Sequence, residues 1–235
     1  MTKLLSFLLL SSFAFGQEFY STINPIKTFA VKSAVAGEVV FVDKSLEKSF
    51  VNGAKVTQLD DSLDTINLEQ TQIKLANLKE IYQIESEILD SYNKVSSKTK
   101  IDKDAQKIKV LNISSNIADM EMQIANLKNN IAKKTIQVKN IYLSSVEIEV
   151  GDFVNAGTLL YKAYDLSSGK LEVFLPISEI DNFKNKTIYL NGMKTNLKIN
   201  TISKVADEKN ISAYKAEIII KNPKTFSKLV KVEFK

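Results

Sequence analysis

The sequence has 235 residues, of which 44% are hydrophobic and 25% are charged, and it carries a formal net charge of +5. This length accommodates one or two domains with hydrophobic cores of their own. The sequence contains no His, Cys, Trp or Arg, which excludes thiolate nucleophiles, imidazole bases and soft-metal sites.

The same composition argues against two function classes. The lysines are dispersed along the chain, and arginine, the residue best suited to bidentate contacts with guanine, is absent, so we expect no nucleic-acid binding. No pair of acidic residues forms a motif for general acid and base catalysis. We therefore expect a protein that is not an enzyme and that has no catalytic residues, cofactor or metal site.

Residues 1–16 have the pattern of a secretory signal peptide. One lysine precedes an apolar run from Leu4 to Phe15, and small residues precede a cleavage point before Gln17. The alternative is an uncleaved anchor, although the run is shorter than the ~20 residues that a spanning helix needs. We expect an exported protein.

A short motif occurs twice, on either side of the middle of the chain. Residues 18–46 have the composition of β-strands, and they are followed by Phe50-Val51-Asn52-Gly53-Ala54-Lys55-Val56. The pattern recurs as Phe153-Val154-Asn155-Ala156-Gly157-Thr158-Leu159-Leu160. The two strand-rich halves are therefore expected to pair in one β-module. Its glycines are expected at turns that require positive φ: Gly37, Gly53, Gly151 and Gly157.

The residues between the two halves have the heptad pattern of a coiled coil. From Val110 to Ile141 the apolar rows are Val110, Ile117, Ile124, Ile131 and Val138, and Ile113, Met120, Leu127, Lys134 and Ile141. The helix expected upstream has two rows of its own: Leu68, Leu75, Tyr82 and Leu89, and Thr71, Leu78, Glu85 and Tyr92. A further apolar line is expected to widen its face: Ile66, Ile73, Ile81, Ile84 and Ile88. The polar segment Asn93–Ile101 joins the two helices, which favours an antiparallel hairpin. Two helices of an ordinary bundle are the alternative.

The C-terminal third, from Gly169, alternates as β-strands do. Asn191-Gly192 indicates a type I′ hairpin, and Ile177–Phe183 reads as a short helix with Ser178 as its N-cap. Several short strands with one small helix predict a compact β-barrel.

These elements predict an elongated, mainly β, α+β fold. A split lipoyl-like β-module carries an inserted antiparallel coiled-coil α-hairpin and is followed by a small β-barrel. The expected boundaries are 1–16 for the signal peptide, 17–30 for an N-terminal arm or barrel strand, 31–61 for the first lipoyl half, 62–141 for the hairpin, 142–168 for the second lipoyl half and 169–235 for the barrel.

This order of parts resembles the periplasmic adaptors, or membrane fusion proteins, of the HlyD and RND-efflux adaptor family. The two repeated half-motifs are similar to the family's lipoyl half-sites, and residues 171–181, LEVFLPISEID, are similar to the start of its barrel. The resemblance implies a subunit in the periplasm, associated with the inner membrane through its partners. The resemblance also implies that this subunit links an RND-type inner-membrane transporter to a TolC-like outer-membrane channel for the export of drugs or toxic compounds. It implies as well that the subunit self-associates into a ring.

The resemblance also implies that the hairpin tip contacts the channel. The family's pattern of an Arg, a Leu four residues on and a Ser seven residues later falls on Ser91, Val95 and Asp102, so the Arg is lost and an Asp replaces the Ser. Lysines make the tip basic, and a solvated loop is the alternative reading. The expected contact residues are Ser91, Lys94, Val95, Lys98, Lys100, Asp102 and Lys103.

Two other functions compete with this interpretation. Adaptors of type I secretion or ABC-type exporters have a true N-terminal membrane helix and a longer hairpin, which the sequence lacks. A lipoyl or biotinyl carrier needs an exposed Lys at a tight turn between the half-modules, where this chain has a long helical insert. We therefore rank the carrier last.

Overall fold

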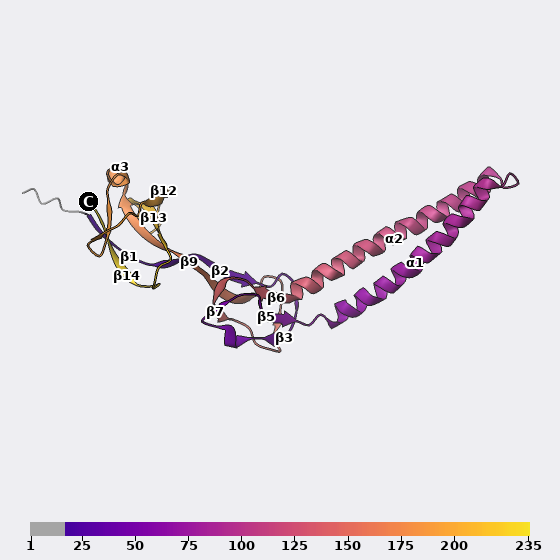
Figure 1. Cartoon of the computed structure of the whole chain (residues 1–235), viewed down its shortest axis with the longest axis horizontal. Helices are drawn as coiled ribbons and strands as arrows, with labels where there is room; N and C mark the ends of the chain where they lie inside the picture. The colour runs from indigo at the N-terminus through magenta and orange to yellow at the C-terminus, as the bar shows by residue number, and fades with distance from the viewer. Residues whose placement is uncertain (1–16) are drawn as a thin grey trace, which may run out of the picture. The chain divides into compact units, whose positions relative to one another are not determined.

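The structure is a computed structural model that describes residues 17–235 (Figure 1). The expected signal peptide, residues 1–16, lies outside the described residues. The described chain divides into two compact units. Residues 30–163 form the hairpin unit, and residues 17–29 with 164–235 form the barrel unit.

Strands lie before and after the two long helices in the chain, and one short helix lies within the C-terminal run of strands. The strands are β1 (Gln17–Thr22), β2 (Asn24–Lys32), β3 (Gly37–Val42), β4 (Ser49–Val51), β5 (Ala54–Leu59), β6 (Thr135–Val138), β7 (Ile141–Val146), β8 (Phe153–Val154), β9 (Leu159–Pro176), β10 (Ile188–Leu190), β11 (Met193–Lys194), β12 (Ile199–Ala206), β13 (Ala213–Lys221) and β14 (Leu229–Phe234). The helices are α1 (Ser62–Lys94), α2 (Lys100–Lys134) and α3 (Ile180–Lys184), with 3₁₀ turns at Lys44–Leu46 and Ile177–Glu179.

The two half-motifs share one hydrophobic core, as the sequence predicted. Val51 of β4 and Val154 of β8 are 3% and 1% exposed and belong to the same cluster, with Leu59 and Leu143. Strand β4 of the first half pairs with β7 of the second half. Strand β3 of the first half pairs with β8 of the second half. Each half therefore supplies strands that pair with the other half, and the module closes across the helical insert.

The glycines of this module differ in what they do. Gly53, Gly151 and Gly157 have φ of 75°, 94° and 93°, as expected. The expectation is wrong for Gly37, which lies at the start of β3 without a positive φ, because its role is close packing: a Cβ there would be 3.2 Å from the Cβ of Leu59.

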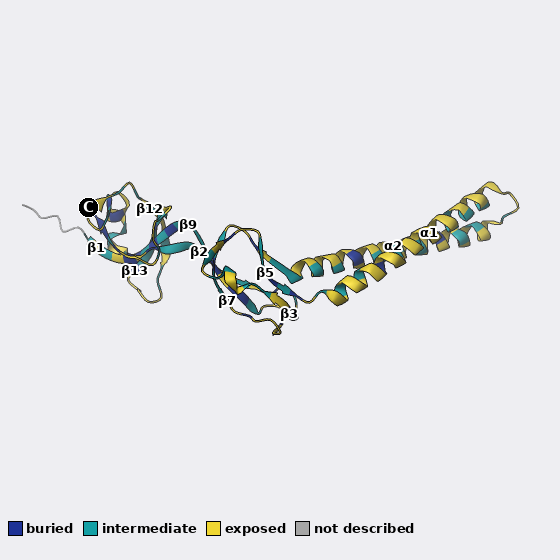
Figure 2. Ribbon diagram, turned by 60° about the horizontal axis from the view of Figure 1, so that its bottom comes forward, coloured by how far each residue is buried: buried dark blue, intermediate teal, exposed yellow. Residues whose placement is uncertain are grey.

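The helices α1 and α2 lie side by side as an antiparallel coiled coil (Figures 1 and 2). At ~1.5 Å per residue, each is roughly 50 Å long. The side chains of α2 that are not exposed follow the predicted heptads without interruption: Lys103, Gln106, Val110, Ile113, Ile117, Met120, Ile124, Leu127, Ile131 and Lys134. The spacing between successive residues in this list alternates between three and four. This spacing confirms the predicted seam and excludes the ordinary bundle.

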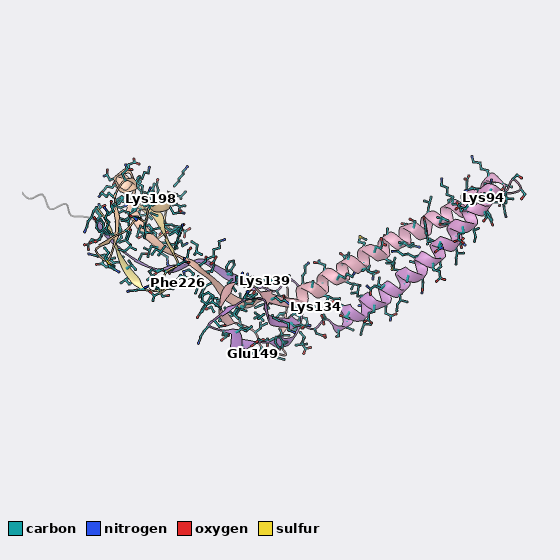
Figure 3. All side chains as sticks on the ribbon, viewed as in Figure 1. Lys94, Lys134, Lys139, Glu149, Lys198 and Phe226 are labelled. Atoms are coloured by element: carbon teal, nitrogen blue, oxygen red, sulfur yellow. The ribbon has the colours of Figure 1, made fainter. Side chains whose placement is uncertain are left out.

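Several polar residues in and beside the seam are paired across it. The Glu85 carboxylate accepts hydrogen bonds from the Gln106 amide at 2.7 Å and lies 2.5 Å from the Lys109 ammonium. At the base of the hairpin, the Lys134 ammonium lies 2.7 Å from the Asp64 carboxylate (Figure 3). Because an unpaired charge in a seam is costly, each pair favours one register of the two helices over its neighbours.

Two details of the predicted hairpin are wrong. Helix α2 ends at Lys134, and the heptad residue Val138 belongs to strand β6. The β-branched residues of β6 pair with β5 there, from Ala54↔Val138 to Gln58↔Thr135, and this ladder replaces the last helical turn. The second error is the apolar line expected to widen the face of α1: Ile66, Ile73, Ile81 and Ile84 are exposed, because their heptad positions point away from α2.

The barrel unit has two sheets around a second core. One sheet has the order β1-β14-β10-β11, and the other includes the run β12-β13-β9. At the centre the rings of Phe19, Phe183 and Phe234 pack edge to face, with centroids 5.1–5.8 Å apart. Asn191 and Gly192 both have positive φ, as the predicted type I′ turn requires.

The short helix of the barrel unit differs in one respect from the prediction. A 3₁₀ turn, Ile177–Glu179, leads into α3, so the predicted helical segment exists. Ser178 is not its N-cap, because β9 continues to Pro176 and places Ser178 inside the turn.

The Glu85 pairing predicts a pH-dependent hairpin. A hydrogen bond from Lys109 lowers the pKa of the Glu85 carboxyl from its usual value, and one from Gln106 adds to this effect. The ionised form therefore stabilises the folded state above the unfolded pKa of about 4.3, and this contribution is lost as the pH falls through the folded pKa. We expect Glu85→Gln to melt a few degrees below the parent protein at pH 7.

Thermal melts followed by circular dichroism should show this difference shrinking as the pH falls through the folded pKa of Glu85, because both side chains are then neutral. Other carboxyl groups titrate in both proteins and cancel in the comparison. A difference that persists unchanged at pH 3 would mean that the charge of Glu85 contributes nothing to the seam.

Candidate functional site: the hairpin tip

The tip of the hairpin, residues 91–103, is organised by a capping box at the start of α2. The backbone N–H of Asp102 donates to the Thr99 hydroxyl oxygen at 3.2 Å, and the backbone N–H of Thr99 donates to the Asp102 carboxylate at 3.1 Å. The Thr99 hydroxyl also donates to this carboxylate and lowers its pKa. These bonds satisfy donors that a helix start would otherwise leave open.

The lysines of the tip project from this frame. Lys98 lies with its ammonium 4.2 Å from the centre of the Tyr92 ring, a cation–π contact. Within residues 17–235, none of Lys94, Lys98, Lys100 and Lys103 has a carboxylate at ion-pair distance. Lys94 lies at the end of α1, on the tip (Figure 3). The fold therefore uses the charges of these lysines very little.

The positions singled out by the family pattern have different local roles. The Ser91 hydroxyl donates to the backbone carbonyl of Glu87 in its own helix, and Asp102 is occupied by the capping box. Val95 directly follows α1 and is 45% exposed. All three positions are exposed, and Val95 is the one whose side chain is apolar and takes no part in a local hydrogen bond.

Sequence reasoning missed two features of the tip. Ile101 is 80% exposed and adds an apolar side chain to the surface formed by Val95. The capping box was readable as Thr99-x-x-Asp102, an N-cap residue followed three positions later by an acid. Val95 and Ile101 give the tip an apolar part, and the tip lysines give it a basic part.

Among residues 17–235, no group of three or more acidic residues is arranged to hold a metal ion. The Lys170 ammonium lies 2.8 Å from the Glu172 carboxylate and 3.3 Å from that of Glu217, and the Glu172 contact comes first among the causes that raise the pKa of Lys170. Paired charges on one sheet in this way are typical of structural ion networks.

No protein-family model matches this sequence, and no match to its sequence was found among the curated proteins. No helix among the described residues has the length and apolar character to cross a membrane.

Several solved structures are nevertheless similar in fold. MacA from Actinobacillus actinomycetemcomitans superposes with a TM-score of 0.75 at 16% identity, over 94% of this chain and 78% of that one. A MacA-MexA chimera containing the Pseudomonas aeruginosa MexA α-hairpin domain gives 0.73 at 18%, over 94% and 78%. The membrane fusion protein Spr0693 from Streptococcus pneumoniae R6 gives 0.71 at 13%, over 93% and 98%. The resemblance predicted from the sequence is thus confirmed at the level of the fold.

The capping box predicts how the tip responds to a single substitution. Thr99→Ala removes the cap and should weaken the first turn of α2 by about 1 kcal/mol. Amide hydrogen exchange at the start of α2 should accelerate roughly fivefold, while exchange in the middle of the hairpin stays the same. Thr99→Ser keeps the hydroxyl and serves as the control. Equal exchange in the Ala and Ser variants would contradict a structural role for the cap.

Proposed function

We propose that this chain, which has the fold of the membrane fusion proteins, is the periplasmic adaptor of a tripartite efflux pump. It links an inner-membrane transporter, which we place in the RND class, to a TolC-like outer-membrane channel for the export of drugs or toxic compounds. Its role is not catalytic: the transporter supplies the energy, and the adaptor connects and seals the path.

The observation that carries this proposal is the hairpin itself. A coiled-coil arm roughly 50 Å long ends in a surface whose lysines have no carboxylate at ion-pair distance within residues 17–235. A rigid arm with an exposed apolar and basic end is suited to reach and contact another protein. The basic side chains favour a channel end that carries acidic groups.

The tip lysines should therefore be required for export. We expect the triple variant Lys94→Glu, Lys98→Glu, Lys100→Glu to reduce dye efflux in cells at least tenfold, because it places like charges against the acidic channel. Lys103 is left unchanged because it is half-buried in the seam. Circular dichroism should show the same helical content as in the parent protein.

A matched variant controls for the change in net charge. Lys74, Lys128 and Lys133 are exposed on the same two helices, away from the tip, and have no ion pair in the described chain. Replacing these three residues with Glu should leave efflux unchanged. Normal efflux in the tip variant, with the protein folded, would refute the assignment of the tip as the channel contact.

Self-association into a ring is supported by the two half-motifs. Phe50 and Phe153 occupy equivalent places in the repeat, and both are exposed, at 71% and 69%. Phe50 also packs edge to face on Tyr142, with ring centroids 5.4 Å apart. One module therefore carries two different apolar faces. Contact of one face with the other face of the next copy is heterologous, and such contacts form a ring when the rotation between copies closes.

This arrangement gives a prediction for the purified protein. Phe50→Ser or Phe153→Ser alone should weaken each contact roughly tenfold or more, because burial of a Phe side chain contributes about 1.5–3 kcal/mol. In sedimentation velocity, each variant should be monomeric where the parent protein assembles. An equimolar mixture should form dimers only, because one intact pair of faces remains.

The control for this experiment is Tyr20→Ser, which removes an aromatic side chain of similar exposure, 64%, from the barrel unit. It should assemble as the parent protein does. Rings that form normally from either Phe variant would rule out these faces as the contact.

A further inference from the structure

The barrel unit contains a cavity of about 420 Å³ whose charged lining is entirely basic. It lies between the end of α3, the start of β10 and the segment from Lys194 to Ile199. Its charged lining residues are Lys184, Lys186, Lys194 and Lys198, without an Asp or Glu. Figure 3 labels Lys198 on this unit.

Little of this positive charge is neutralised. Lys184 is paired with Asp181 at 2.7 Å, and Lys186 lies over the Phe183 ring at 5.2 Å from its centre. Within residues 17–235, Lys194 and Lys198 have no ion pair.

Four carboxylates of the barrel unit pair with lysines that do not line the cavity. Glu172 and Glu217 pair with Lys170 and Lys215, and Glu18 and Glu233 pair with Lys231. A concave site with several lysines and few nearby acids concentrates anions. The cavity is therefore suited to a phosphate or a carboxylate.

An apolar hollow adjoins the lysine cavity. It has a volume of about 740 Å³ and is lined by Leu190, Leu197, Ile219 and Ile220. The two spaces share the segment from Thr195 to Lys198, so they lie against the same short stretch of chain. A ligand that fills both must combine an anionic group with a hydrocarbon part.

The topology also places this region close to the point where the apolar leader ends. Gln17, the first residue after the leader, pairs with Phe234, and Phe234 pairs on its other side with Ile188 of β10. At ~4.8 Å between strands, Gln17 and Ile188 are about 10 Å apart. Thr187, next to Ile188, lines the lysine cavity. The expected leader, residues 1–16, would therefore bring this sheet to a membrane surface during export, whether or not it is later removed.

We propose that the barrel unit binds an anionic phospholipid, with the phosphate among Lys194, Lys198 and their neighbours and an acyl chain in the adjoining apolar hollow. The proposal is independent of the adaptor function, because it concerns a different unit from the hairpin tip. It gives the protein a membrane contact of its own in addition to contacts through partners.

Vesicle binding tests the proposal. The chain from Gln17 onward, which holds both cores, is sedimented with vesicles of phosphatidylglycerol and phosphatidylcholine in a 1:3 ratio, and with phosphatidylcholine alone. We expect binding only to the former. Lys194→Gln with Lys198→Gln should weaken it roughly 25-fold, about fivefold for each lysine near an anionic surface.

A second pair of lysines serves as a control that distinguishes binding in the cavity from binding through general surface charge. Lys224 and Lys228 are exposed in the same unit and do not line the cavity. Replacing both with Gln removes the same charge and should weaken binding far less. An equal loss in the two double variants would overturn the site, as would an absence of binding to the phosphatidylglycerol vesicles.

A further arm distinguishes a lipid from a free phosphate. Ile219 lines the apolar hollow but does not belong to the barrel core, so Ile219→Ser should weaken vesicle binding while the protein stays folded. Titration with inorganic phosphate should show only weak binding that this substitution does not change. Phosphate binding as tight as vesicle binding, with no effect of Ile219→Ser, would indicate a phosphate site and refute the lipid proposal.

Discussion

The pairing of β5 with β6 is the constraint on which the hairpin depends. Helix α1 begins at Ser62, just after β5 ends, and α2 passes directly from Lys134 into β6. The ladder therefore holds the two ends of the hairpin side by side in the folded protein. The strands are in turn held by the core that both halves of the module share. A shift in this ladder would move every heptad residue of one helix past its partner.

The residues at this junction transmit the strand register to the helices. The carboxylate of Asp60 accepts a hydrogen bond from the backbone N–H of Ser62, and its carbonyl accepts one from the Lys134 ammonium. Lys134 also pairs with Asp64, near the positive end of the α1 dipole. One lysine thus joins the residue that follows β5, the first turn of α1 and the end of α2. Lys134, an interruption in an apolar pattern, is a necessary part of the hairpin's base.

Local periodicity explains which parts of this fold were readable from the sequence. Residues 110–134 repeat every seven positions because each heptad faces the same neighbour, so pattern and burial agree. The pattern failed beyond Lys134 because the apolar spacing of Val138 also suits a strand, and the partner strand β5 lies far away in the sequence. The lysine cavity had no signal at all, since its residues are scattered over α3, a turn and a loop that only the folded barrel brings together.

The exclusive use of lysine sets how such a protein binds its partners. A lysine is a flexible, strongly hydrated point charge, whereas an arginine holds a carboxylate or phosphate in a fixed bidentate geometry. Contacts through Lys98 or Lys198 are therefore individually weak, screened by salt and readily broken. Such contacts give stable attachment only when several act on one scaffold. The ring proposed above would meet this requirement, because it repeats each weak contact at every subunit.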